Sequence, residues 1–195
     1  MSRAKPGKKF KTAKPKKSHR TGLFVFATVI IIVLGVAAYI SSQPPRPAGG
    51  IGDNAPDFTL PMVTSTGLSD QTVALSSLRG KVVVLEFMVS WCHVCQDMAP
   101  SIEFLHQKYQ GQGVVFLSVA GTQSGATAKT TAEFIRAYNS TWTYALDTDD
   151  SVFAAYKVEA TPTILVLDGS GKILSRFQGA LPTDALASAI DLALS

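Results

Sequence analysis

An uncharged run of nineteen residues, from Gly22 to Ile40, constrains this chain more than any other feature. As a helix, the run is about long enough to cross the hydrocarbon core of a bilayer. Residues 1–20 hold nine Lys or Arg and no acid, whereas the segment after the run has only Arg46. From its length we predict one transmembrane helix over residues 21–41. Lys and Arg accumulate on the cytoplasmic side of a membrane, and this sets the orientation of the helix. The basic tail, residues 1–20, is then cytoplasmic and the C-terminal part extracytoplasmic.

The same segment has two other interpretations. The run could be the core of a signal peptide cleaved at Val36-Ala37-Ala38, although it is long for such a core. The basic tail could bind nucleic acid, but topology and contact with anionic lipid heads already account for it. We therefore expect residues 22–40 to remain in the lipid bilayer as the anchor of a single-pass membrane protein.

The remainder of the chain is acidic. Residues 21–195 hold nine basic and fourteen acidic side chains, a net charge of −5, which argues against nucleic acid as a partner of the folded part. Residues 42–52 are rich in Pro and Gly and show no apolar periodicity, as in a flexible linker. A single folded domain, residues 53–195, is expected to follow this linker.

The apolar pattern of the domain alternates between strands and helices. Val82–Val89 is a nearly continuous apolar run, typical of a strand that is buried on both faces. Apolar residues then repeat on one face of a helix that ends at Gly111 and Gly113; they are Val94, Met98, Ile102, Leu105 and Tyr109. Further strands are predicted at 57–63, 72–75, 114–120, 163–167 and 172–177. Further helices are predicted at 131–139, 151–156 and from an N-cap at Thr183, the last burying Leu186, Ile190, Ala193 and Leu194.

This order of elements predicts an α/β fold. Strands that alternate with helices build a central mixed sheet flanked by helices on both faces. The two strands before residue 82, around a turn at Gly67, form an N-terminal β-hairpin extension, and residues 168–171 have the composition of a second hairpin turn. The predicted architecture is therefore one transmembrane helix followed by a single α/β domain.

The chemistry is concentrated in Trp91-Cys92-His93-Val94-Cys95, which follows the buried strand and opens a helix. Two cysteines three positions apart at a helix start can close a small disulfide ring. Cys92 would lie over the free amides at the positive end of the helix dipole, which lowers the thiol pKa and favours the attacking thiolate. Cys95 lies one turn further in, which suits a thiol that resolves a mixed disulfide.

The cysteine pair has two less reactive interpretations. A structural disulfide is the first, but a bridge across so short a loop removes little entropy from the unfolded chain. Half of a Cu(I) or Zn site is the second. Few other ligands are available, because His19 precedes the predicted membrane helix and His106 lies about three turns beyond Cys95. Nothing in the sequence indicates a resident metal or another cofactor.

Glu86 interrupts the buried strand five residues before Trp91. A buried carboxylate is costly unless it is paired or protonated, so the pKa of Glu86 is expected to be raised toward neutral pH. Beneath the cysteine pair, Glu86 can take the proton of Cys95 as Cys95 resolves a mixed disulfide. The alternative is a strand-end glutamate that reaches solvent or pairs with a lysine.

Pro162 stands in Ala160-Thr161-Pro162-Thr163, just before a predicted strand, where proline suits an edge, a turn or a cis bond. With this segment about 70 residues after the cysteines, the chain resembles the thioredoxin superfamily. It is most similar to the membrane-anchored, extracytoplasmic oxidoreductases of the TlpA/ResA type. Ala55–Leu60, Leu75–Lys81, Pro100, Leu146-Asp147 and Asp168–Lys172 also carry this likeness. The resemblance covers about residues 53–193 and implies a thioredoxin-like fold.

The resemblance implies a role for each matching position. Cys92 becomes the nucleophile and Cys95 the resolving thiol, and the two form a disulfide when oxidised. Glu86 falls where the family often has a buried acid. Pro162 falls on the cis-proline of the family, whose preceding backbone, at Thr161, pairs with the substrate chain in a short β-like contact.

The residues next to the cysteines leave the chemistry less closely defined. Trp91 is either the aromatic flank of the active site or an ordinary half-buried core residue. His93-Val94 stands where the family often has Gly-Pro or Glu-Pro. A cationic His93 would stabilise the Cys92 thiolate and make the couple more oxidising; the alternative is an exposed His93 with no such role. Met98 stands where some members that mature cytochromes carry an acid.

The resemblance therefore predicts an oxidoreductase that acts on protein disulfides or dithiols outside the membrane. It favours a reductant or isomerase, which needs a membrane electron donor, over a disulfide-donating oxidant, which needs a membrane electron acceptor. A thiol peroxidase of the AhpC/TSA type is another alternative. Such enzymes carry Thr or Ser where Val89 stands and a nearby Pro, yet no Pro occurs between Pro61 and Pro100. A copper carrier that binds through the cysteines and His93 is the last alternative.

Overall fold

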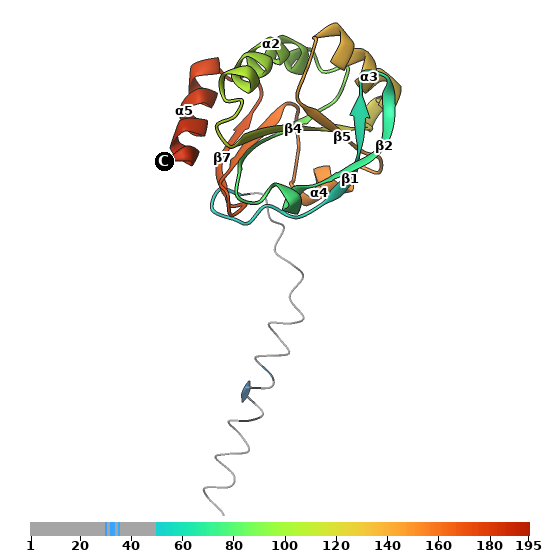
Figure 1. Cartoon of the computed structure of the whole chain (residues 1–195). Coiled ribbons are helices and arrows are strands. Elements are labelled where there is room, and N and C mark those ends of the chain that lie inside the picture. Colours follow the sequence, from blue (N-terminus) through green and yellow to red (C-terminus); the bar gives the residue numbers. More distant parts are fainter. Residues whose placement is uncertain (1–29, 31, 34, 36–49) are drawn as a thin grey trace, which may run out of the picture. The chain divides into compact units, whose positions relative to one another are not determined.

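The computed structural model describes residues 50–195, together with residues 30, 32, 33 and 35 (Figure 1). Contacts divide the chain into two units, residues 1–46 and 47–195, and the second contains every element named below. Among the described residues, no helix combines the length and the apolar character needed to cross a membrane. The predicted basic tail, most of the predicted membrane helix and residues 42–49 of the predicted linker lie outside the described residues.

A seven-stranded mixed sheet forms the centre of the domain, with the strand order β2-β1-β5-β4-β3-β6-β7. The strands are β1 (Thr59–Thr64), β2 (Gly67–Ala74), β3 (Val82–Met88), β4 (Val114–Gly121), β5 (Thr143–Asp147), β6 (Thr163–Leu167) and β7 (Ile173–Gln178). The three central strands β3, β4 and β5 are parallel, and every other neighbouring pair is antiparallel. The pair β1–β2 is the hairpin that the sequence predicts before β3.

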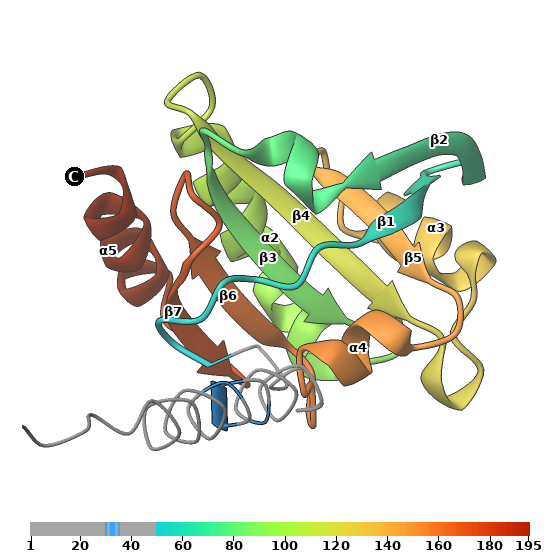
Figure 2. The same cartoon turned by 90° about the horizontal axis from the view of Figure 1, so that it is seen from below.

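Helices cover both faces of this sheet. On one face lie α2 (His93–Lys108), α3 (Ala128–Ala137) and α5 (Thr183–Leu194) (Figure 1). On the other lies α4 (Ser151–Ala155), beside the segment that leads into β1 (Figure 2). Two short 3-10 helices, η1 (Leu75–Leu78) and η2 (Gln123–Gly125), complete the fold. The architecture is the thioredoxin-like α/β fold that the resemblance implies.

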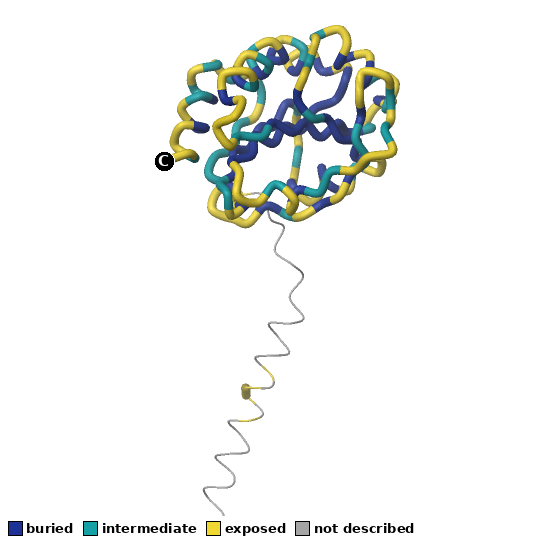
Figure 3. The backbone as a smooth tube through the Cα atoms, in the orientation of Figure 1, coloured by how far each residue is buried: buried dark blue, intermediate teal, exposed yellow. Residues whose placement is uncertain are grey.

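The alternation of residues along β3 assigns its side chains to two separate cores. All seven residues of the strand are buried, as its nearly continuous apolar sequence predicts, and Figure 3 shows the buried strands at the centre. The even-numbered apolar residues, from Val82 to Met88, belong to the core beneath α2, α3 and α5. The odd-numbered residues, from Val83 to Phe87, belong to the core on the α4 face. Because neighbouring side chains alternate between faces, Glu86 projects toward α2.

The described chain joins the sheet at the end of the strands opposite to the end that carries the cysteines. Gly52 donates its N–H to the carbonyl of Ile173 at 2.8 Å, at the start of β7. Ile173 pairs with Leu167, and Leu167 pairs with Val83 near the start of β3. Cys92 follows the other end of β3, and a strand of seven residues is about 20 Å long.

One strand, β5, is absent from the sequence-based prediction. Its five residues form too short a segment to show a clear apolar period. Four of them are nevertheless buried, because β4 pairs with one side of the strand and β1 with the other. The strand is therefore defined by its neighbours in the sheet, which the local pattern does not reveal.

Two helix starts differ from the prediction. The α3 helix begins at Ala128 rather than at residue 131, because Thr127 and Thr130 form a capping box. The prediction that Thr183 caps the last helix is wrong. Pro182 occupies the N-cap position of α5, and the Thr183 hydroxyl donates to the hydroxyl of Ser101 at 2.9 Å.

Two residues predicted to be buried are exposed. Val94 is 37 % exposed, because the buried side of the first turn of α2 carries Cys95 instead. Leu194 is 41 % exposed at the last position of α5, one turn beyond Ile190, which still packs in the core. Both side chains lie in terminal turns of their helices.

Candidate active site

Cys92 and Cys95 form a disulfide at the first turn of α2. The chain reaches this point directly from the end of β3, and Cys92 N–H donates to the Val89 carbonyl at 3.0 Å. Cys92 is 6 % exposed, whereas Cys95 is fully buried. The sulfur of Cys92 is therefore the one that an incoming protein can reach first.

The start of α2 favours negative charge on the sulfur of Cys92. Cys92 is the N-cap residue, and its Sγ accepts a hydrogen bond from the backbone N–H of Cys95 at 3.1 Å. The first turn of this helix carries no acidic residue. The positive end of the helix dipole and the free amides therefore stabilise a Cys92 thiolate once the disulfide is reduced.

The peptide bond between Thr161 and Pro162 is cis, and it lies against the cysteines. The sulfur of Cys92 is 3.5 Å from the carbonyl oxygen of Thr161. A disulfide sulfur has no proton to donate, so this contact becomes a hydrogen bond only with the Cys92 thiol. The loop is held by hydrogen bonds from Gly179 N–H to the Pro162 carbonyl and from the Thr163 hydroxyl to the Ala160 carbonyl, both 2.8 Å long.

Glu86 lies buried on the α2 side of the sheet, in the same core as both cysteines. It is the carboxylate that the sequence places beneath the pair, and it does not reach solvent. Within the described chain, Glu86 does not hydrogen-bond directly to either sulfur. A proton moving between Cys95 and Glu86 therefore needs a bridging water or a small movement of the side chains.

The carboxylate of Glu86 is hydrogen-bonded on the neighbouring strand. Glu86 on β3 is paired with Ser118 on β4, and the Ser118 hydroxyl donates to Glu86 Oε2 at 2.5 Å. The indole N–H of Trp142 donates to the same hydroxyl oxygen at 2.7 Å. Burial raises the pKa of the Glu86 carboxyl to about 7, although the hydrogen bond from Ser118 opposes this rise. Glu86 can therefore exchange a proton near neutral pH.

The residues that flank the cysteines lie at the surface. Trp91 is 50 % exposed, and its indole N–H donates to the Gln123 carbonyl at 3.1 Å. It is therefore a surface residue beside Cys92, and its interpretation as a core residue is wrong. His93 and Val94 are also exposed at the first turn of α2. The structure thus brings together Cys92, Cys95, Trp91, Thr161 and Pro162, with Glu86 in the core below.

Ser118 and Trp142 are parts of this site that the sequence reasoning missed. Ser118 carries a signal that could have identified it, because it is the one polar residue in the apolar strand Val114–Ala120, just as Glu86 interrupts its own strand. Trp142 has no comparable signal. It reaches Ser118 only because the chain folds back beside β4 at the start of β5.

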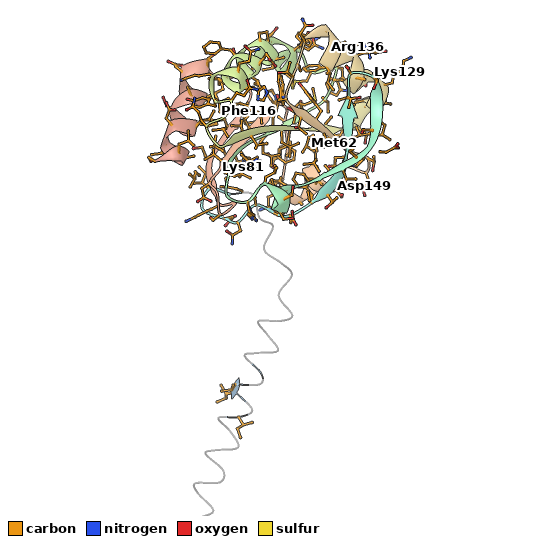
Figure 4. The ribbon with its side chains drawn as sticks, viewed as in Figure 1. Met62, Lys81, Phe116, Lys129, Arg136 and Asp149 are labelled. Atoms are coloured by element: carbon orange, nitrogen blue, oxygen red, sulfur yellow. A yellow bond between two sulfur atoms is a disulfide. The ribbon has the colours of Figure 1, made fainter. Side chains whose placement is uncertain are left out.

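The described residues contain no group of three or more His, Cys, Asp or Glu side chains arranged to hold a metal ion. His106, the other histidine of α2, packs its ring against Phe116, 5.6 Å between ring centroids (Phe116 is labelled in Figure 4). It faces a different part of the core from the cysteines. Of the two histidines of α2, His93 is therefore the one that stands beside the cysteines.

Known proteins of the same kind match most of the chain. The model of the AhpC/TSA family matches residues 51–176. The chain is 32 % identical over 178 residues to the thiol-disulfide oxidoreductase ResA of Oceanobacillus iheyensis, covering 90 % of this chain and 91 % of that protein. It is 28 % identical over 162 residues to ResA of Bacillus subtilis, covering 83 % and 84 %.

Solved structures share the fold. A putative thiol:disulfide interchange protein DsbE from Chlorobium tepidum superimposes with a TM-score of 0.66 at 30 % identity, covering 76 % of this chain and 100 % of that one. A secreted Mycobacterium tuberculosis disulfide oxidoreductase homologous to E. coli DsbE gives a TM-score of 0.59 at 25 % identity, covering 69 % and 95 %.

Proposed function

The chain belongs to the AhpC/TSA family and is a thiol–disulfide oxidoreductase, and we propose that it reduces or isomerises disulfides of other proteins outside the cytoplasmic membrane. Its family implies protein dithiols or disulfides as substrates. The observation that carries the proposal is the position of Cys92. Its sulfur caps α2 and lies 3.5 Å from the carbonyl of Thr161, before a cis-proline.

The reaction consists of two exchanges between sulfur atoms. The Cys92 thiolate attacks one sulfur of the substrate disulfide, that bond breaks, and the departing substrate thiolate takes a proton. Cys95 then attacks Cys92, forming the Cys92–Cys95 disulfide and releasing the second substrate thiol. Two electrons have passed to the substrate, so a membrane electron donor must reduce the pair again. In isomerisation, a second substrate thiol attacks the mixed disulfide instead, and Cys95 is not oxidised.

Glu86 is the proposed proton acceptor for the second exchange. Cys95 attacks as a thiolate, yet it is fully buried and has no access to bulk water. Glu86 shares its core, and its pKa of about 7 allows the carboxylate to accept a proton near neutral pH. The transfer requires a bridging water or a small movement of the side chains, because Glu86 hydrogen-bonds to neither sulfur among the described contacts.

The substrate chain is proposed to lie along Thr161. The Thr161 backbone stands beside Cys92 at the surface, where an extended segment can form a short β-like contact with it. Trp91, the residue directly before Cys92, offers an exposed aromatic face. These two contacts hold the substrate sulfur over Cys92 while the disulfides exchange.

The direction of electron flow is proposed to be toward the substrate. The relatives above carry the name thiol-disulfide oxidoreductase, which by itself allows either direction. His93 is the residue that can shift the balance, since a cationic ring beside Cys92 stabilises the thiolate and makes the couple more oxidising. Its exposure at the first turn of α2 keeps the ring in high-dielectric surroundings, where that effect is weak.

Residues 22–40 are proposed to anchor the protein in the membrane, with the N-terminus in the cytoplasm and residues 42–52 as the linker. The apolar length and the nine basic residues before it support this topology. The match to the Oceanobacillus protein covers 178 residues, more than the 146 of residues 50–195, so it extends into the N-terminal segment. Alkaline extraction of membranes tests the anchor: release of the intact protein would contradict it.

The test of the proposed function uses the full-length protein in detergent micelles. Equilibration of the cysteine pair in thiol–disulfide buffers should give a potential close to that of thioredoxin, about −270 mV. A value near −120 mV would instead indicate an oxidant. Cys95→Ser should accumulate mixed disulfides with protein substrates, and the double variant Cys92→Ser/Cys95→Ser should accumulate none. Rapid stoichiometric consumption of peroxide by the reduced protein would favour the peroxidase alternative.

A further inference from the structure

A hollow of about 300 Å³ lies beside the active site, between the start of α2 and one face of α3. We call it the Trp91 pocket. Residues 130, 133, 134 and 137 of α3, with Tyr138 at its C-cap, form the helical wall, since they recur every three or four positions and so share one face. Trp91 and Gln96 form the opposite wall. The pocket therefore begins at the residue that directly precedes Cys92.

Hydrogen bonds hold the walls of the pocket in place. The Trp91 indole is tied to the Gln123 carbonyl at 3.1 Å. The Ser90 hydroxyl donates to Thr130 Oγ1 at 2.8 Å, which connects the loop before α2 to the first turn of α3. The side-chain amide of Gln96 donates to the Ser90 carbonyl at 3.1 Å. A ligand can therefore enter without first ordering these residues.

The lining combines aromatic rings with one carboxylate. Trp91, Phe134 and Tyr138 contribute rings, and the rings of Phe134 and Tyr138 pack 4.7 Å apart. Among the described residues of the lining, Glu133 is the one with a charge. Its carboxylate makes no ion pair or hydrogen bond with another described residue. A solvated acid beside aromatic faces is an arrangement that attracts a cation.

The basic residues of α3 form no ion pair with this carboxylate, although Lys129 stands four residues before Glu133 and Arg136 three residues after it. Lys129 and Arg136, both labelled in Figure 4, lie on the same helix but do not line the pocket. Arg136 donates to the Ser65 carbonyl in the turn between β1 and β2. The domain as a whole has an excess of acid, with eight basic and fourteen acidic side chains in residues 50–195.

We propose that the Trp91 pocket binds an arginine or lysine side chain of the protein substrate, close in sequence to the cysteine that reacts with Cys92. This inference rests on the proposed function, because it names the kind of substrate segment that the site selects. The basic side chain lies between the rings of Trp91 and Tyr138 and pairs with Glu133. Arginine fits best, because its planar guanidinium stacks on rings and forms two parallel hydrogen bonds to a carboxylate.

The experiment measures reduction of disulfide-linked peptides by the full-length protein in detergent micelles. The peptides carry Arg, Leu or Glu at one or two positions on either side of the cysteine. At one of these positions, Arg should react about fivefold faster than Leu, and Glu slower than Leu. Glu133→Gln should remove most of the Arg preference, leaving the rate on the Leu peptide and the reduction potential unchanged. Glu133→Lys should reverse the preference and favour Glu.

Asp70→Asn is the matched control. It changes the net charge as Glu133→Gln does, but Asp70 lies exposed on β2, outside the pocket. The Asp70→Asn variant should prefer the Arg peptide as strongly as the unaltered protein does. Loss of the Arg preference in this variant would overturn the proposal in favour of a general charge effect. An Arg-to-Leu ratio that Glu133→Gln leaves unchanged overturns the proposal while the proposed function stands. Failure to reduce any peptide or protein disulfide overturns both.

Discussion

Trp142 donates its indole N–H to Ser118 Oγ at 2.7 Å, and this bond determines where the Ser118 proton goes. An indole nitrogen is a donor only, so the serine oxygen must accept from it. The single O–H of Ser118 is then directed to Glu86 Oε2, 2.5 Å away. A buried chain of three side chains, from the residue before β5, from β4 and from β3, thus opposes part of the effect of burial on the Glu86 pKa.

Ser118→Ala should move the pH dependence of catalysis to higher pH. The substitution removes the hydrogen bond that lowers the Glu86 pKa, so this pKa rises further above its present value of about 7. Glu86 must be ionised to accept a proton from Cys95, and the resolving rate at pH 7 should fall. The alkaline shift of the rate profile should be about one pH unit. Ser118→Thr, which keeps a hydroxyl, is the control, and an identical profile in Ser118→Ala would refute the role of this bond.

Glu86→Gln should remove a pH dependence of stability. The pKa of Glu86 is raised in the folded state from 4.5 to about 7. An acid with a raised pKa contributes stability that is fully present below the unfolded pKa and is lost as pH rises through the folded pKa. The native protein should therefore lose on the order of 3 kcal/mol from this group between pH 4.5 and pH 8, whereas Glu86→Gln should not. Urea unfolding at several pH values measures this difference, and parallel curves would contradict it.

The two cysteines should differ in reactivity when studied singly. Cys92 keeps 6 % of its surface exposed at the helix N-cap, whereas Cys95 is fully buried. In Cys95→Ala, the remaining Cys92 should be alkylated by iodoacetamide at least about tenfold faster than the remaining Cys95 in Cys92→Ala. Rates measured at neutral pH with full-length protein decide the order of attack. Faster alkylation of Cys95 would reverse the assigned roles.

Gly171→Ala should destabilise the protein without altering the cysteines. Gly171 closes the turn between β6 and β7 with a φ of +80°, and the Arg79 guanidinium lies where a β-carbon would be added. The left-handed backbone alone should cost about 1–2 kcal/mol, and the displacement of Arg79 adds to it. Adding Arg79→Ala to the Gly171→Ala variant should recover only the stability that is lost by displacing the Arg79 side chain. The reduction potential should not change, since this turn lies at the far edge of the sheet from Cys92.

The reactive pair and its setting were predictable because they are encoded in a short stretch of chain. A buried strand, a helix start and two cysteines one turn apart lie within Val82–Tyr109, and local pattern and helix chemistry suffice to interpret them. Glu86 could be singled out for a similar reason, since a charged residue in an apolar strand is locally conspicuous. The parity of strand residues then placed it on the face of α2.

The tertiary structure alone decided which distant residues complete the site. Ser118 and Trp142 reach Glu86 through strand pairing, and Glu133 and Trp91 line one pocket because α2 and α3 cover the same face of the sheet. These contacts join segments tens of residues apart, and the apolar periodicity within a segment does not predict them. The sequence by itself determined the strand–helix unit that carries the cysteines, because its stabilising interactions are local. The register of the sheet and the packing of its helices determined the hydrogen bonds at Glu86 and the pocket, because those depend on long-range pairing.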